Sequence, residues 1–97
     1  MLTGKALEYF NEWRWECMGH IEFDLLPKSL QYALVIEWFD SVKINICVDR
    51  WSLKFWSSNV YTPYRNNLGI EFENRKYAIE KAITKANEIY NNMSYVN

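Results

Sequence analysis

The fold is decided by residues 43–55, which read KINICVDRWSLKF. Apolar and polar residues alternate here through Ile44, Ile46 and Val48, whereas apolar residues in the flanking segments recur every three to four positions. A period of two is typical of a β-strand that buries one face. The stretch therefore predicts two strands, 44–48 and 51–56, joined by a short turn at Asp49 and Arg50.

A third strand is predicted after a loop. Residues 57–67 contain Pro63 and two adjacent asparagines, a composition typical of a loop. Alternation returns at Leu68, Ile70 and Phe72. Because each of the three strands has one apolar face, we expect an antiparallel meander that is covered on one side only.

Two amphipathic helices are predicted near the ends of the chain. Residues 4–18, between Thr3 as N-cap and Gly19 as stop, have a helical stripe that consists of Ala6, Phe10, Trp13 and Cys17. After Asn74, which is suited to cap a helix, a second stripe consists of Ile79, Ala82, Ile83, Ala86, Ile89 and Tyr90. Each stripe predicts a helix that buries one side.

Residues 27–42 are compatible with two interpretations. The run Tyr32–Phe39 is rich in β-branched and aromatic residues, as in a buried strand, but Pro27 suits the first turn of a helix. We favour the helix, which has two apolar stripes. We expect the stripe formed by Leu30, Leu34 and Trp38 to remain uncovered, and its burial against a second copy across a two-fold axis predicts a homodimer.

The chain is predicted to form one domain over residues 1–97. Ninety-seven residues suffice for a single modest core, and no repeat, linker or low-complexity tract divides them. Residues 93–97 are expected to fray. The predicted order of elements is α-α-β-β-β-α. The fold class is therefore an α+β two-layer sandwich, in which the helices pack on one face of a three-stranded antiparallel meander.

Charge and targeting features narrow the function. Eleven Lys and Arg against twelve Asp and Glu give a net charge of −1, which argues against a duplex-DNA binder. The first residues lack the pattern of a secretory signal, and no apolar run approaches the roughly twenty residues that span a membrane. We expect a cytoplasmic protein with reduced cysteines and no membrane partner.

The candidate reactive residues are Cys17, His20 and Cys47. Three such ligands fall short of the four that a structural zinc site needs. His20 could activate Cys47 as a nucleophile, but Cys47 lies in a predicted strand rather than at an exposed, electropositive position. No hydrolase or metalloprotease motif accompanies them. We predict no enzyme activity, no metal and no cofactor, and keep a small hydrolase or metal enzyme around these residues as the third alternative.

Aromatic and basic residues interleave between residues 50 and 65, and this is the most suggestive functional feature. The candidate binding surface consists of Arg50, Lys54, Trp56, Tyr61, Tyr64 and Arg65. The alternation places Trp51, Leu53 and Phe55 in the core and leaves Trp56 on the opposite face. Such residues are enriched at protein interfaces, and they also stack on single-stranded nucleic acid. The near-neutral charge favours an unknown protein partner, single-stranded nucleic acid is the alternative, and a merely aromatic-rich core would explain the rings without a partner.

Two parts of the chain resemble short proteins of phages and prophages of gut bacteria. The first is Trp38–Val42 with the alternating Ile44–Ile46, and the second is the C-terminal helix at Ala78–Ala82 and Lys85–Asn91. The resemblance covers about half of the chain and implies an origin in a mobile element, without assigning a role to any residue. Together with the charge and composition, it predicts a small, non-catalytic accessory protein that acts by binding another protein.

Overall fold

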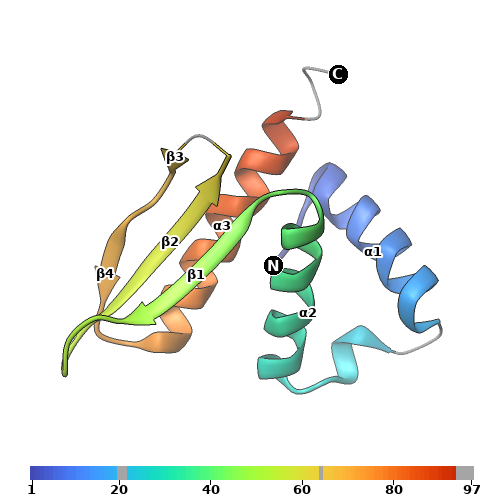
Figure 1. Ribbon diagram of the computed structural model, residues 1–97. Helices are drawn as coiled ribbons and strands as arrows, with labels where there is room; N and C mark the ends of the chain where they lie inside the picture. The colour runs from blue at the N-terminus through green and yellow to red at the C-terminus, as the bar shows by residue number, and fades with distance from the viewer. Residues whose placement is uncertain (20–21, 64, 94–97) are drawn as a thin grey trace.

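A computed structural model describes residues 1–19, 22–63 and 65–93 (Figure 1). Within these residues the helices are α1 (Gly4–Met18), the short 3-10 turn η1 (Phe23–Leu25), α2 (Lys28–Ser41) and α3 (Arg75–Met93). The strands are β1 (Asn45–Arg50), β2 (Trp56–Thr62), β3 (Arg65–Asn66) and β4 (Ile70–Phe72). The predicted α+β fold and its order α-α-β-β-β-α are confirmed. β4 lies in the predicted third strand, whereas β3 is an additional short strand within the predicted loop at residues 57–67.

The sheet is antiparallel and has β2 at its centre. β1 pairs with one edge of β2, and β3 and β4 pair with the other edge. Tyr61 is opposite Asn66 in β3, whereas Ser58 is opposite Ile70 in β4, so the register shifts by one residue between the two short strands. One extra residue is therefore accommodated between β3 and β4, next to Gly69 at a φ of 66°. This bulge separates β3 from β4.

The predicted turn at Asp49 and Arg50 is wrong. β1 continues through Arg50, the connection occupies residues 51–55, and β2 occupies residues 56–62, of which 57–62 were predicted as a loop. The sequence of β2 is misleading because a polar residue occupies a core position. Ser58 is fully buried, and its Oγ donates a hydrogen bond of 2.7 Å to the carbonyl of Ala78 in α3. A buried hydroxyl is tolerated when it is hydrogen-bonded in this way.

The helices are not equally close to the sheet. α3 lies along one face of it, α2 packs beside β1, and α1 packs on α2 and α3 at the end of the molecule away from the sheet (Figure 1). The molecule is flat, with principal extents of 40 × 34 × 17 Å. The β1–β2 hairpin tip and α1 lie toward opposite ends of it (Figure 1).

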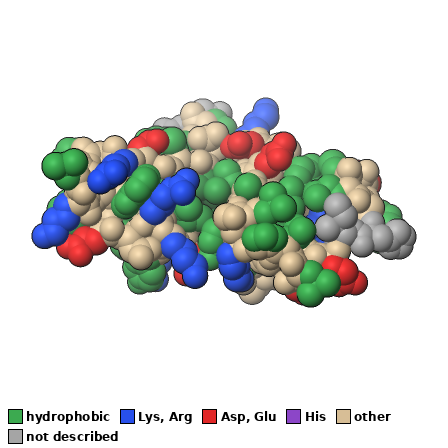
Figure 2. All heavy atoms as spheres, turned by 90° about the horizontal axis from the view of Figure 1, so that it is seen from below, with side chains coloured by type: hydrophobic (Ala, Val, Ile, Leu, Met, Phe, Trp, Pro, Cys, Tyr) green, Lys and Arg blue, Asp and Glu red, His purple; other side chains and the backbone are tan. Residues whose placement is uncertain are grey.

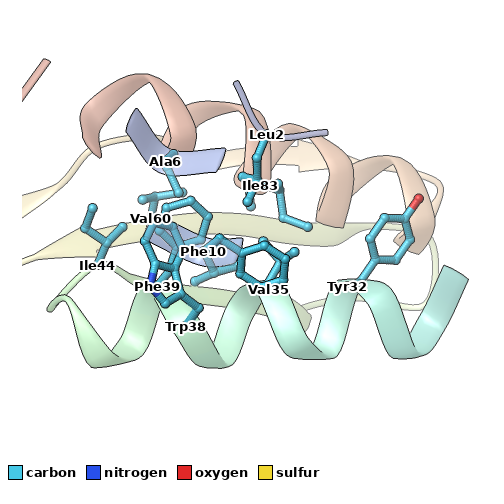
Figure 3. Close-up of a cluster of buried hydrophobic side chains, with 13 residues drawn as sticks. Leu2, Ala6, Phe10, Tyr32, Val35, Trp38, Phe39, Ile44, Val60 and Ile83 are labelled. Carbon is cyan, nitrogen blue, oxygen red and sulfur yellow. The ribbon is translucent and has the colours of Figure 1, made fainter. Parts of the chain in front are cut away.

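The core lies between the three helices and the adjoining parts of β1 and β2 (Figure 3). Trp38 is at its aromatic centre, with ring centroids 5.8 Å from Phe10, 4.9 Å from Phe39 and 5.0 Å from Tyr90. Such ring pairs add about 0.5–1.5 kcal/mol each beyond the burial of their area. Ile83 of α3 is 1 % exposed in the same core, so the predicted stripe of the last helix is the one that is buried.

The helical interpretation of residues 27–42 is confirmed, and the strand alternative is wrong. The predicted uncovered stripe is not exposed as a unit, because Trp38 is only 2 % exposed and Leu34 is half-buried, whereas Leu30 is 44 % exposed. α2 packs against α1 as well as against α3 and β1, so it buries more of its circumference than the sequence analysis assumed. The symmetric dimer through these three residues loses its basis.

Two asparagines of α3 close the N-terminus of α1. Asn87 Oδ1 accepts the backbone N–H of Thr3 at 2.9 Å, and Asn87 Nδ2 donates to Thr3 Oγ1 at 3.0 Å. Asn91 Oδ1 accepts the N–H of Ala6 at 2.8 Å, and Asn91 Nδ2 donates to the Thr3 carbonyl at 3.0 Å. The first N–H groups of a helix need such outside acceptors. Thr3 is in the predicted cap position, but its side chain makes no cap hydrogen bond, and α3 supplies the acceptors instead.

Candidate functional site

The residues predicted as one binding surface are not brought together. Arg50, Lys54 and Trp56 lie at the hairpin tip, whereas Tyr61 and Arg65 lie at the opposite end of β2. Tyr61 lies five positions after Trp56 along β2. The two residues are therefore about 16 Å apart along the strand and lie on opposite faces of the sheet. Tyr64 lies outside the described residues. The predicted surface is therefore split between the two ends of β2.

The face of the sheet away from α3 is polar. By register it consists of Asn45, Cys47, Asp49, Ser57, Asn59, Tyr61, Asn66 and Glu71. Asn59 is only 8 % exposed because its side chain is held flat, donating to Ser57 Oγ at 2.9 Å and accepting from Asn66 Nδ2 at 2.9 Å. One ring and no cation among these residues do not make the stacking platform that single-stranded nucleic acid requires.

The cysteines do not form a reactive pair with another described group. Cys17, predicted in the buried stripe of the first helix, is exposed, and His20 lies outside the described residues. The Cys47 thiol donates to Asp49 Oδ2 at 3.2 Å, and this hydrogen bond, with partial burial, raises the Cys47 pKa. A raised pKa disfavours the nucleophilic thiolate. Within the described ranges, no group of three or more His, Cys, Asp and Glu side chains is placed to hold a metal ion.

A cleft of about 340 Å³ lies between the N-terminal halves of α2 and α3. In it the hydroxyl of Tyr32 donates a 2.6 Å hydrogen bond to Glu80 Oε1, and Lys28, Lys76 and Thr84 contribute to the walls. Burial and the hydrogen bond to Glu80 together raise the pKa of Tyr32 to about 12. The Tyr32 phenol stays protonated near neutral pH and donates its hydrogen bond to the Glu80 carboxylate. This hydrogen bond connects α2 to α3.

The hairpin tip is an ordered loop that exposes apolar side chains. Leu53 is 94 % exposed and Trp51 is 62 % exposed. Arg50 donates from Nε and Nη2 to the carbonyls of Ser52 and Leu53, at 3.3 and 3.1 Å. Ser52 Oγ accepts the backbone N–H groups of residues 54 and 55, at 3.2 and 3.1 Å. The loop backbone is thus hydrogen-bonded locally, while its apolar side chains point away from the core that they were predicted to join.

Trp56 and two arginines form the base of the loop. Trp56 lies on the helix side of the sheet, since it shares the register parity of Ser58, and not on the predicted opposite face. The guanidinium carbon of Arg75 lies 5.4 Å from the centroid of its ring, and that of Arg50 lies 5.9 Å away. Cation–π contacts of this kind contribute about 0.5–1 kcal/mol each at exposed sites. They also orient the planar guanidinium groups at the surface.

We call the resulting area the hairpin-end surface. It consists of Arg50, Trp51, Leu53, Lys54, Trp56, Phe72, Arg75 and Tyr77, with Phe72 and Tyr77 in an edge-to-face contact at 5.1 Å. Residues 50–56 and 72–81 contain five Lys or Arg and two Glu, a formal charge of +3. Figure 2 shows Lys and Arg side chains interleaved with hydrophobic ones over this end of the molecule. Phe72, Arg75 and Tyr77 could not be predicted for this surface, because only the folded chain places them beside the hairpin.

Comparison with known proteins adds no relative from which a role could be transferred. No family model, no curated protein and no solved structure matches the chain. Within the described part of the chain, no helix combines the length and apolar character needed to cross a bilayer.

Proposed function

We propose that this chain is a small non-catalytic protein, of phage or prophage origin, that binds another protein through the hairpin-end surface. The observation that supports the proposal is the exposure of Leu53 and Trp51 on a loop whose backbone is hydrogen-bonded. An exposed apolar side chain gains free energy when a partner removes it from water, and an ordered loop loses little entropy on binding. The phage origin is proposed from the sequence resemblance alone.

The surface supplies two kinds of contact. Trp51 and Leu53 are apolar anchors of the type that fill pockets in a partner. Arg75 is held against Trp56 and has no ion pair among the described residues, so its planar donors are available for a carboxylate. Apolar anchors beside oriented cations form the usual composition of an interface hot spot.

Single-stranded nucleic acid is the competing occupant. Two guanidinium groups already contact the ring of Trp56, which leaves this ring less accessible for stacking on a base. The open sheet face has Tyr61 as its single ring in the register described above. These two features favour a protein partner over a nucleic acid.

Site-specific photo-crosslinking tests the proposal. A photoreactive residue at position 53 is expected to crosslink a defined protein in an extract of the source cell. The same residue at position 84, which is also exposed but lies outside the hairpin-end surface, is not. Trp51→Ser should abolish the crosslink from position 53. Crosslinks from position 53 to nucleic acid alone, or identical products from positions 53 and 84, would contradict protein binding at this surface.

A further inference from the structure

We infer that the partner of the hairpin-end surface is a second copy of this chain, bound head to tail through the outer side of its α1 helix. This inference depends on the proposed function, because it names the occupant of the same surface. It replaces the two-fold dimer predicted from the sequence, which required Trp38 to be exposed.

The outer side of α1 has the composition that the hairpin end would bind. Trp15, which is 56 % exposed, lies on this side close to Glu8 and Glu12, and Leu7, which is 42 % exposed, and Glu16 lie at its two opposite edges. We call these five residues the α1 outer surface. Residues 4–19 and 22–24 contain five Asp or Glu and two Lys or Arg, a formal charge of −3. The apolar side chains of α1 are thus bordered by acids.

The α1 outer surface also contains a shallow hollow. It is open and nearly flat, and is lined by Asn11, Glu12, Trp15 and Glu16. An apolar side chain with a cation beside it would contact the exposed part of the Trp15 ring and face the carboxylates of Glu12 and Glu16. Leu53 at the hairpin tip has those properties, because its neighbour Lys54 is mostly exposed and makes one long ion pair, at 3.9 Å with Glu73.

The two surfaces are complementary in charge and similar in apolar content. The hairpin end has a formal +3 and the α1 end has a formal −3, although the whole chain has a net charge of only −1. Opposite potentials steer two surfaces together and disfavour the like-charged pairings of hairpin end with hairpin end or α1 with α1. The net charge of −1 is therefore the sum of two oppositely charged ends, which attract each other between copies of the chain.

The position of the surfaces determines the type of assembly. They lie toward opposite ends of a molecule whose longest extent is 40 Å (Figure 1). A contact between two different surfaces leaves one of each unoccupied, so it continues into a ring or an open chain of subunits. Self-association is therefore expected to grow with concentration beyond the dimer and to weaken at high salt.

Two single-surface variants test the inference. The hairpin variant combines Leu53→Ser with Arg75→Glu, and the α1 variant combines Glu12→Lys with Trp15→Ser. Each is expected to weaken self-association at least about tenfold in sedimentation velocity experiments. Mixing the two is expected to restore a single contact, between the intact α1 outer surface of the first and the intact hairpin end of the second, and to give a 1:1 dimer that does not grow. Lys28→Glu, an exposed charge reversal outside both surfaces, should associate like the parent.

The outcomes separate this inference from the proposed function. A parent that stays monomeric at all concentrations overturns the inference, and so does a mixture of the two variants that fails to dimerise. If position 53 nevertheless crosslinks a different protein, the proposed function stands without self-association. If the parent associates but neither variant weakens it, both the head-to-tail contact and the role of the hairpin-end surface in it are wrong. Circular dichroism of each variant confirms that loss of association is not loss of fold.

Discussion

The helical end and the hairpin end of this molecule use aromatic residues in opposite ways. At the helical end, Phe10, Trp38 and Phe39 are at most 2 % exposed and pack in one cluster. At the hairpin end, Trp51 is 62 % exposed and Trp56 contacts two guanidinium groups. The comparison teaches that an aromatic content of 18 % is the sum of a core and a surface, which have different energetic roles.

The largest expected effect is unfolding of the domain when a charge is placed in the core of the helical end. Ile83→Asp places a carboxylate where the side chain is 1 % exposed, and burial of an unpaired charge together with the lost apolar area should cost several kcal/mol and unfold the domain. Thermal melting followed by circular dichroism measures this. Thr84→Asp, an exposed neighbour on the same helix, should change the free energy of unfolding by about 1 kcal/mol or less. If Ile83→Asp has the same melting temperature as the parent, Ile83 of α3 does not pack in the core.

The next effect concerns the asparagines that join α3 to α1. Asn91→Ala leaves the N–H of Ala6 without its acceptor and removes one of the two hydrogen bonds that the Thr3 carbonyl accepts, and this should lower the free energy of unfolding by about 1–3 kcal/mol. Asn91→Asp retains the acceptor for Ala6 but loses the donor to Thr3, and is expected to fall between the parent and the alanine variant. Asn92→Ala, at an exposed neighbouring position, serves as the control. Equal stability of Asn91→Ala and Asn92→Ala in urea unfolding would rule out this closure of α1.

A smaller, pH-dependent effect is expected where α2 meets α3. Tyr32→Phe removes the hydrogen bond to Glu80 and should cost about 0.5–1.5 kcal/mol near neutral pH. The folded pKa of Tyr32 is raised from 10.0 to about 12, so the folded state binds the phenol proton more tightly than the unfolded state. The stability from this group is fully present below pH 10 and is lost as the pH rises from 10 through 12. The difference in unfolding free energy between parent and Tyr32→Phe should therefore shrink over that interval, and a constant difference would contradict the raised pKa.

The helical end was predictable from the sequence because its signals are local. The spacing of Phe10 in α1 and Ile83 in α3, the cap at Asn74 and the stop at Gly19 depend on residues within a few positions of one another. The Asn74 side chain accepts the N–H of Tyr77 at 2.9 Å, as a helix cap does. The closure of α1 by Asn87 could not be predicted, because the residues that it joins are 84 positions apart.

The hairpin end was mispredicted because alternation was equated with burial. Trp51, Leu53 and Phe55 alternate like a strand, but Arg50 and Ser52 hydrogen-bond the loop backbone locally and leave Trp51 and Leu53 mostly exposed. The true strand β2 contains Ser58 and Asn59, whose burial depends on partners elsewhere in the fold. Polar residues that are buried through tertiary hydrogen bonds have no signature in the local pattern of hydrophobicity. The same error assigned Trp56 to the wrong face of the sheet.

The smallest expected effect on stability tests the hairpin end itself. Trp51→Ser and Leu53→Ser remove large side chains that the sequence pattern assigns to the core, where such truncation would cost about 2–5 kcal/mol. Both side chains are mostly exposed, so each variant should unfold within about 0.5 kcal/mol of the parent. Phe39→Ala, which truncates a fully buried ring at the helical end, should lose about 3–5 kcal/mol under the same conditions. Chemical denaturation of the three variants side by side measures the contrast between the two ends directly.

A loss of more than about 2 kcal/mol in Leu53→Ser would place the hairpin tip in the core, and the hairpin-end surface would then not exist. Stability close to that of the parent, combined with loss of the crosslink from position 53 in Trp51→Ser, would mean that this residue serves binding and not folding.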